Sequence, residues 1–198
     1  MNYLAHAYLS FGQSGILTGN MISDYVKGKA QYDYPADILA GIKLHRAIDT
    51  YTDTHPATAA LKAYYRPQYR LYAGAFADVT YDYFLANDER QFETPVMLQQ
   101  FTQFTYETLT GQAGYFPASF ARMFPYMKTQ DWLYHYRTVE GLEKSFGGLV
   151  RRARYLDEST VAFDIFNTHK DAMQQCYNEF FPSLKNFAAH QLQELLNN

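Results

Sequence analysis

The sequence has 198 residues, of which 47% are apolar and 19% charged, a composition typical of a globular chain and not of a disordered one. The net charge of −3 gives no overall basic surface, so we expect no nucleic-acid partner. No stretch is apolar enough to span a bilayer, and the single cysteine, Cys176, excludes an internal disulfide and fits a cytoplasmic location.

Glycine and proline residues punctuate the chain, and the segments between them have helical rather than alternating apolar spacing. The predicted helices span residues 2–11, 15–27, 36–53, 57–64, 68–87, 95–110, 118–127, 130–146, 158–181 and 183–196. No repeat, low-complexity tract or linker divides them. We therefore predict an all-α fold in which residues 1–198 form a single multi-helix domain.

The predicted helix 15–27 carries two polar residues beside its apolar side. Asn20 and Asp24 are four residues apart, so they are neighbours on one helix face, next to Leu17 and Met21. A carboxylate in that position needs a partner, because an unpaired charge turned toward a core is costly.

The predicted helix 36–53 has the same feature. At 100° per residue, His45 and Asp49 fall in one sector with Ile42, on the face expected to meet the core. Arg46 lies along the border of this sector. Arg46 would either hold a phosphate oxygen or form a salt bridge with a neighbouring carboxylate of the same helix.

The predicted helix 68–87 repeats the pattern, with Asp78 and Asp82 four apart in a sector shared with Leu85. Buried ion pairs and tyrosine hydrogen bonds would explain any one of these acids. Over the three helices together, however, the acids outnumber the nearby bases, mainly Lys27 and Arg46. Like charges held together favour a bound cation.

The donor types narrow the choice of metal. Carboxylates with one or two imidazoles, and no cysteine nearby in sequence, suit Mg²⁺ or Mn²⁺ better than structural zinc. These ions polarise phosphoryl oxygens and activate water, which favours hydrolysis of phosphate esters. Outside these helices, Arg151, Arg152 and Arg154 form a basic cluster, which is either a solvated surface or a docking site for an acidic partner.

Several of these residues resemble one family. The blocks that carry the resemblance are Met1-Asn2-Tyr3-Leu4-Ala5-His6, Gly19-Asn20 with Asp24, His45-Arg46 with Ile48-Asp49 and Thr52-Asp53, and Asp78-Val79 with Asp82 and Phe84-Leu85. Looser matches are Trp132-Leu133, Tyr136-Arg137, Arg151-Arg152, His169 with Asp171-Ala172, and Phe181-Pro182. The chain resembles the acyl carrier protein phosphodiesterase family, which is similar to the all-helical HD-type metal phosphohydrolases.

The resemblance implies a metal-dependent hydrolase that uses Mn²⁺ or Mg²⁺ to remove 4′-phosphopantetheine from holo acyl carrier protein. It implies Asp24 as an essential acid, with His6, His45, Asp49 and Asp78 as companions. We accordingly expect Asp24, Arg46 and Asp49 to be catalytic, and His6, Asp24, His45 and Asp78 to bind metal. Because acyl carrier proteins are acidic, the resemblance gives Arg151 and Arg152 a role in binding the carrier.

Two alternatives stay open at this stage. One is a related HD-type phosphohydrolase that acts on a nucleotide or another small phosphodiester. The other is a non-catalytic helical module that binds a carrier protein or an acyl chain. The metal content of the purified protein separates this module from the two enzymes.

Overall fold

The computed structural model describes residues 1–153, 155–156 and 158–197. The regular secondary structure of these residues is entirely helical, which confirms the predicted all-α class. The α-helices are α1 (Tyr3–Tyr8), α2 (Ser14–Ile22), α3 (Ala36–Thr54), α4 (Pro56–Tyr69), α5 (Ala73–Ala86), α6 (Pro95–Gly111), α7 (Ala118–Thr129), α8 (Trp132–His135), α9 (Val139–Arg152) and α10 (Thr160–Asn197). Between them lie the short 3-10 helices η1 (Ser23–Tyr25), η2 (Gly28–Asp33), η3 (Arg70–Tyr72) and η4 (Ala113–Tyr115).

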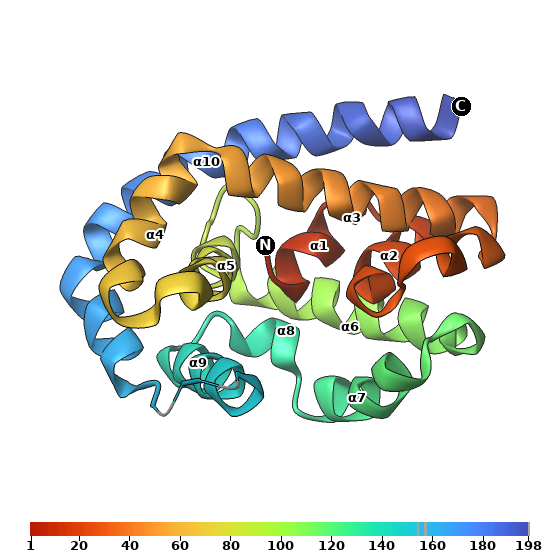
Figure 1. Ribbon diagram of the computed structural model, residues 1–198. Helices are drawn as coiled ribbons and strands as arrows, with labels where there is room; N and C mark the ends of the chain where they lie inside the picture. Colours follow the sequence, from red (N-terminus) through yellow and green to blue (C-terminus); the bar gives the residue numbers. More distant parts are fainter. Residues whose placement is uncertain (154, 157, 198) are drawn as a thin grey trace.

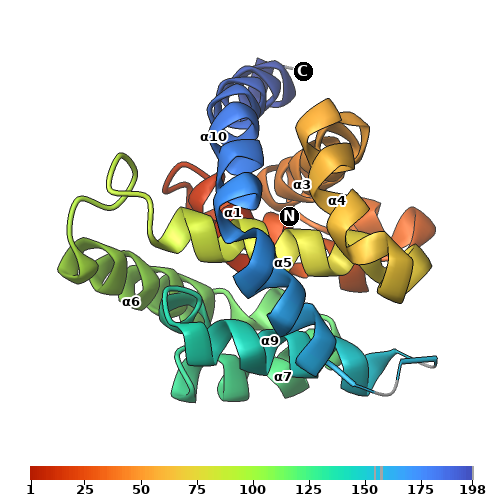
Figure 2. The same cartoon turned by 90° about the vertical axis from the view of Figure 1, so that its left-hand side faces the viewer.

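The long helix α10 contacts helices from both halves of the chain. It packs against α3 and α4, and its second half runs along α3 at the top of Figure 1. Seen from the side, α10 crosses in front of α5 and α9, which it also contacts (Figure 2). Buried apolar side chains from α1 through α10 form one continuous cluster. Among the described residues, no helix is both long and apolar enough to cross a membrane.

Two helix ends that we predicted next to prolines were wrong. The helix predicted to end at residue 64 continues through Pro67 to Tyr69, and α10 continues through Pro182. Each proline removes one backbone hydrogen bond. Continuing the helix nevertheless buries Tyr69 in one case and Leu184 in the other, so tertiary packing outweighs the local cost. The break in α10 instead lies at His169, where φ is −117° and ψ is 16°.

Two further boundaries matter for function. The predicted helix 130–146 is divided into α8 and α9, because Thr138 caps a new helix by accepting a hydrogen bond from the Gly141 N–H at 3.0 Å. The predicted helix 15–27 ends as an α-helix at Ile22, and Asp24 lies in η1. Asp24 is therefore not on the α-helix that carries Asn20.

The helices α2 and α3 cross with their backbones in contact at two glycines. A Cβ atom on Gly19 would lie 2.0 Å from the carbonyl oxygen of Ile38, and one on Gly41 would lie 2.3 Å from that of Ile16. Only glycine permits such an approach. The crossing brings the backbone of Asn20, the residue after Gly19, against α3 at His45, one turn after Gly41.

Candidate active site

A cluster of imidazole and carboxylate groups lies where α1, α2 and α3 pack together. The rings of His6 on α1 and His45 on α3 stack, with centroids 3.9 Å apart and planes 16° from parallel. Asp49, one turn after His45, lies beside both rings. Its Oδ1 is 3.2 Å from His6 Nε2 and its Oδ2 is 3.1 Å from His45 Nε2. Ligand atoms of all three residues lie within 4.8 Å of one another.

Asn20 on α2 orients both imidazole rings. Its Nδ2 donates to the His6 carbonyl at 2.9 Å and to Ser10 Oγ at 3.1 Å, so its Oδ1 accepts from His6 Nδ1 at 2.8 Å. Its backbone carbonyl accepts from His45 Nδ1, also at 2.8 Å. Each Nδ1 atom therefore donates to Asn20, and each Nε2 atom lies beside Asp49.

The two imidazoles differ in protonation. Burial, together with the neighbouring His45, lowers the pKa of His6 to about 4, so His6 is neutral near pH 7. Burial also disfavours a charge on His45, but hydrogen bonds with Asp24 and Asp49 outweigh it and raise the pKa of His45 to about 9. Burial would raise the pKa of Asp49, but contacts with His45 and His6 hold it well below its usual range.

These residues fit a divalent cation. His6 Nε2 is buried and has no hydrogen-bond partner among the described residues, although the Asp49 carboxylate lies beside it. A neutral imidazole directs a lone pair at that carboxylate, an arrangement that a cation between the two groups would relieve. Two imidazole nitrogens held by second hydrogen bonds, with one carboxylate oxygen, are a set of ligands typical of metal sites.

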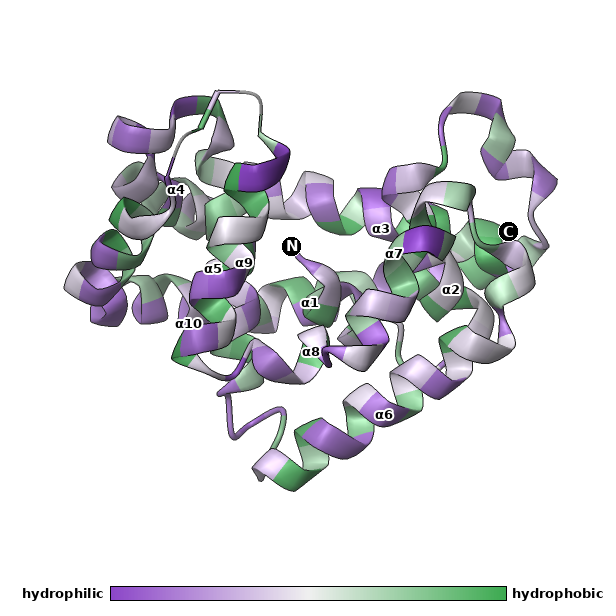
Figure 3. Cartoon of the chain, turned by 90° about the horizontal axis from the view of Figure 1, so that it is seen from below, coloured by the Kyte–Doolittle hydropathy of each residue, from purple (hydrophilic) through white to green (hydrophobic). Residues whose placement is uncertain are grey.

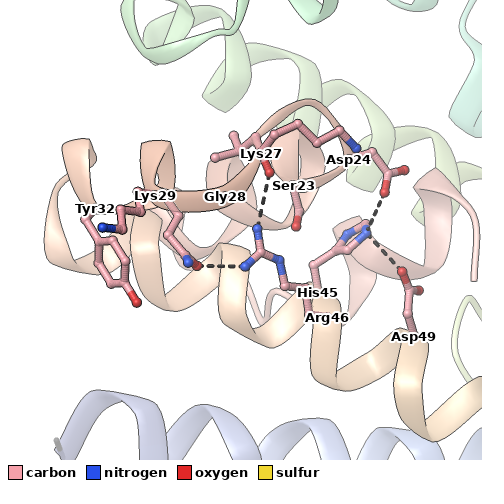
Figure 4. Close-up of a pocket in the computed structure, with 11 residues that line it drawn as sticks. Ser23, Asp24, Lys27, Gly28, Lys29, Tyr32, His45, Arg46 and Asp49 are labelled. Carbon is pink, nitrogen blue, oxygen red and sulfur yellow. Dashed lines mark hydrogen bonds and ion pairs between the residues drawn. The ribbon is translucent and has the colours of Figure 1, made fainter.

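Asp24 meets the cluster from the solvent side. Its Oδ1 lies 3.3 Å from His45 Nε2, and its side chain is 70% exposed. The hydrogen bond with His45 lowers the pKa of Asp24, so the carboxylate is ionised near pH 7. Figure 4 shows His45 between the carboxylates of Asp24 and Asp49. The three residues line an open pocket of about 510 Å³.

Arg46 lines the same pocket and extends towards η2, away from Asp49 (Figure 4). Its Nη1 donates to Gln31 Oε1 at 2.7 Å and its Nη2 to the Val26 carbonyl at 3.2 Å. Among the described residues it has no carboxylate partner, since Asp53 pairs with Lys62 at 2.6 Å. The alternative of a salt bridge along helix α3 was therefore wrong. Lys27 and Lys29 also line this pocket, which adds positive charge around Arg46.

Asp78 lies next to the cluster rather than in it. The α-amino group of Met1 lies 3.2 Å from Asp78 Oδ1 and 3.5 Å from Asp49 Oδ1, so it stands between the two carboxylates. Burial raises the pKa of Asp78, and the amino group opposes this effect. His45 and Asp49 thus contact each other directly, as expected. Asp78 is linked to Asp49 only through the α-amino group of Met1.

Asp82, four residues after Asp78, faces α1. It accepts hydrogen bonds from the backbone N–H groups of Leu4 at 2.7 Å, Ala5 at 3.3 Å and Asn2 at 3.4 Å. These are amide groups at the start of α1, which have no partner inside that helix. Asp82 therefore binds the start of the helix that carries His6. Its spacing from Asp78 suggested another acid of the metal cluster, and that interpretation was wrong.

Arg151 and Arg152 lie apart from this cluster. They occupy the last turn of α9, both side chains are exposed, and they line a separate pocket between α8 and α9. Arg154, the third member of the basic cluster in sequence, falls outside the described residues.

With the geometry established, comparison with known proteins identifies the family. The family model described as "Acyl carrier protein phosphodiesterase" matches residues 1–184. The chain belongs to the acyl carrier protein phosphodiesterase family. The resemblance seen in the sequence is confirmed.

Relatives named acyl carrier protein phosphodiesterase match almost the full length of the chain. Those from Enterobacter sp. (strain 638), Klebsiella pneumoniae (strain 342) and Escherichia coli O139:H28 (strain E24377A / ETEC) are each 29% identical to it. The alignments cover 93%, 95% and 96% of this chain, and 95%, 97% and 98% of the respective relatives. No solved structure matches the chain, and the expected likeness to the HD-type fold stays a prediction.

The sequence of this family member did not predict the role of Asn20. Its spacing from Asp24 marked it only as a polar residue beside an apolar helix face. Asn20 is fully buried, and its partners include His6 on α1, Ser10 just after α1 and His45 on α3. A polar residue within an apolar segment indicates that Asn20 has hydrogen-bond partners. It does not indicate which residues these partners are.

Proposed function

We propose that this protein is a metal-dependent phosphodiesterase that removes 4′-phosphopantetheine from holo acyl carrier protein and leaves the apo form. The observation that carries the proposal is the cluster of His6, His45 and Asp49, with a buried Nε2 atom that has no hydrogen-bond partner, at the end of an open pocket. Family membership supports the choice of substrate.

We propose that His6, His45 and Asp49 hold the cation, with Asp24 contacting the cluster from the pocket and Asp78 adding negative charge beyond Met1. Two imidazoles and a carboxylate favour Mn²⁺ over Mg²⁺, which prefers oxygen ligands. Bound there, the cation would polarise a phosphoryl oxygen and make a water molecule more acidic. Because ligands must be deprotonated, metal binding would displace the proton that His45 otherwise shares with Asp24 and Asp49.

The protein's own groups would then position the phosphodiester and move the protons. Asp24 is ionised, exposed to the pocket and adjacent to the cluster, so it is placed to accept a proton from a water molecule. Arg46 uses two of its nitrogens for Gln31 and Val26. Its other N–H groups have no partner among the described residues and would bind a phosphate oxygen. In the reaction, the bond between phosphorus and the carrier's serine oxygen breaks and the water oxygen bonds to phosphorus. The proton that the water releases balances the proton that the serine oxygen takes up.

We further propose that residues 1–198 act as one phosphodiesterase domain, since the described apolar side chains form one continuous cluster. A cytoplasmic location and the lack of a nucleic-acid partner stay predictions.

The test is to incubate the protein with holo carrier and Mn²⁺ and to follow the carrier by mass spectrometry. We expect conversion to the apo form only when protein and metal are both present. Hydrolysis of a small diester or a nucleotide with the holo carrier left intact would make the protein a phosphohydrolase of another substrate. A purified protein that binds no metal and hydrolyses neither substrate would be a non-catalytic binding module.

A further inference from the structure

A second pocket, of about 630 Å³, lies between α8, α9 and the first residues of the chain. We call it the α8–α9 groove. Tyr3, Trp132 and Tyr136 give it aromatic walls. Seen from below, the N-terminus lies between α9 on one side and α7 on the other (Figure 3). No Asp or Glu among the described residues lines this groove.

The cations of the groove form a stripe along α9. Lys144 and Arg151 are seven residues apart and share one face of the helix, whereas Arg152 lies about 100° further around the helix. All three are exposed and line the groove. Lys144 pairs with Glu140, whereas Arg151 and Arg152 form no ion pair with any described residue. The helix dipole favours cations in the last turn of α9, but it does not explain why they border an aromatic-walled pocket.

The groove and the His–Asp cluster share one structural element. Asn2 and Tyr3 line the groove, and His6 lies three residues after Tyr3, or about 4.5 Å further along the axis of α1. On its other side, the Tyr3 hydroxyl is 2.8 Å from that of Tyr25, the residue after Asp24. A partner seated in the groove would therefore lie directly beside the proposed reaction site.

The proposed reaction requires a surface next to the reaction site on which the carrier protein can bind. The bond that breaks joins phosphorus to a serine oxygen of the carrier, so the carrier's protein surface must approach the site closely. Two pockets border the site. The one in Figure 4 contains the carboxylates of Asp24 and Asp49, which would repel an acidic protein surface, whereas its lysines and Arg46 suit the phosphate. The described residues that line the α8–α9 groove include cations, aromatic rings and uncharged polar groups, but no carboxylate.

We propose that the α8–α9 groove docks the acidic protein surface of the carrier. Lys144, Arg151 and Arg152 would contact carboxylates of the carrier, and Trp132 would supply the apolar contact at the centre of the interface. This inference rests on the proposed function for the identity of the partner. The 4′-phosphopantetheine arm would then occupy the pocket shown in Figure 4.

Trp132 is the only tryptophan of the chain, so its fluorescence reports binding in the groove without any catalysis. Two probes separate the two parts of the substrate: an apo carrier without tryptophan, which presents the protein surface alone, and free 4′-phosphopantetheine, which presents the arm alone. We expect the apo carrier to change Trp132 fluorescence, with a Kd that weakens as salt is added, and free 4′-phosphopantetheine to leave it unchanged. A response to the arm but not to the apo carrier, or to neither, would overturn the docking proposal.

The matched variants are Arg151→Glu with Arg152→Glu, and as control Lys43→Glu with Arg66→Glu, which makes the same change in net charge at exposed positions of α3 and α4. We expect the α9 variant to weaken apo-carrier binding about tenfold and the control to have less effect. The KM for holo carrier should rise more than the KM for a small diester. Equal weakening in both variants, or a salt dependence unchanged in the α9 variant, would contradict the proposal.

If the α9 double variant is unstable by thermal melting, Arg151→Gln with Arg152→Gln removes the charges without reversing them and is expected to weaken binding in the same direction. Binding of apo carrier and hydrolysis of holo carrier are separate measurements, so failure of the proposed function can be distinguished from failure of the docking proposal. A wild-type protein that binds apo carrier through Trp132 but hydrolyses no holo carrier retains the docking surface and lacks the activity.

Discussion

The His–Asp cluster and the α8–α9 groove lie at two ends of the short helix α1, and they handle charge in opposite ways. In the cluster, His6 and His45 are buried and each ring is fixed by a hydrogen bond to Asn20. In the groove, Arg151 and Arg152 are exposed and have no ion-pair partner among the described residues.

The difference matches the ligand that we propose for each region. A small cation needs ligand atoms held within a few tenths of an ångström, which requires buried side chains with second hydrogen bonds. A protein surface is attracted over longer distances by exposed charges, at low cost in positioning and with a strong dependence on salt. Substitutions in the cluster should therefore act on the chemistry or the fold, and substitutions in the groove on recognition.

The largest effect is expected from Asp24→Ala, which should lower kcat roughly 10²- to 10⁴-fold by removing the proposed proton acceptor. The fold should be retained, because the Asp24 side chain is 70% exposed and lies in η1 outside the α-helices. Steady-state kinetics and circular dichroism measure the two quantities. Asp33→Ala, an exposed acid in η2, is the matched control and should be nearly silent. Equal loss of helicity and activity in Asp24→Ala would assign Asp24 a structural role.

The next effect tests whether backbone contact between α2 and α3 builds the cluster. In Gly19→Ala the new Cβ would collide with the Ile38 carbonyl, so the helices must separate, at a cost of about 3 kcal/mol. Activity should fall with stability, since Asn20 would lose its contact with His45. Gly111→Ala, with nothing within 4 Å of the added Cβ, should be neutral or slightly stabilising in the same chemical denaturation experiment. An active and stable Gly19→Ala protein would contradict this account.

Metal binding should raise the melting temperature as the Mn²⁺ concentration passes the dissociation constant. At a hundredfold excess over Kd the gain is about 2.7 kcal/mol. A chelator should reverse it, and His45→Gln should abolish it, because the variant lacks one of the proposed ligands. Differential scanning calorimetry with and without Mn²⁺ provides the measurement. A wild-type melting temperature indifferent to both Mn²⁺ and chelator would eliminate the metal site.

The smallest effect is a pH dependence of the metal-free protein. The pKa of His45 is raised from 6.5 to about 9, so its stabilising contribution is fully present below pH 6.5 and is lost as pH rises through 9. The loss is on the order of 1 kcal/mol, because the partners Asp24 and Asp49 are partly exposed and screened by solvent. The difference in unfolding free energy between wild type and His45→Gln isolates this term from other groups. A difference that stays constant between pH 6.5 and 9 would be inconsistent with a protonated His45.

Much of the fold was predictable because most helices are bounded by local signals. The prediction failed where tertiary burial outweighed proline, as at Pro67 and Pro182, and where Thr138 started a new helix that the apolar spacing did not mark. At the candidate site, the pairing of His45 with Asp49 was predictable because residues four apart are neighbours on any α-helix.

The sequence by itself determined the all-α class, the family resemblance, and the His45–Asp49 pair on one face of α3. Only the tertiary structure decided that His6 stacks on His45, that Asn20 orients both rings, and that Asp82 serves α1 instead of the cluster. The physical reason is that spacing along one helix fixes which side chains share a face. Contacts between helices depend on how closely and at what angle the backbones cross, and for α2 and α3 the close approach depends on Gly19 and Gly41.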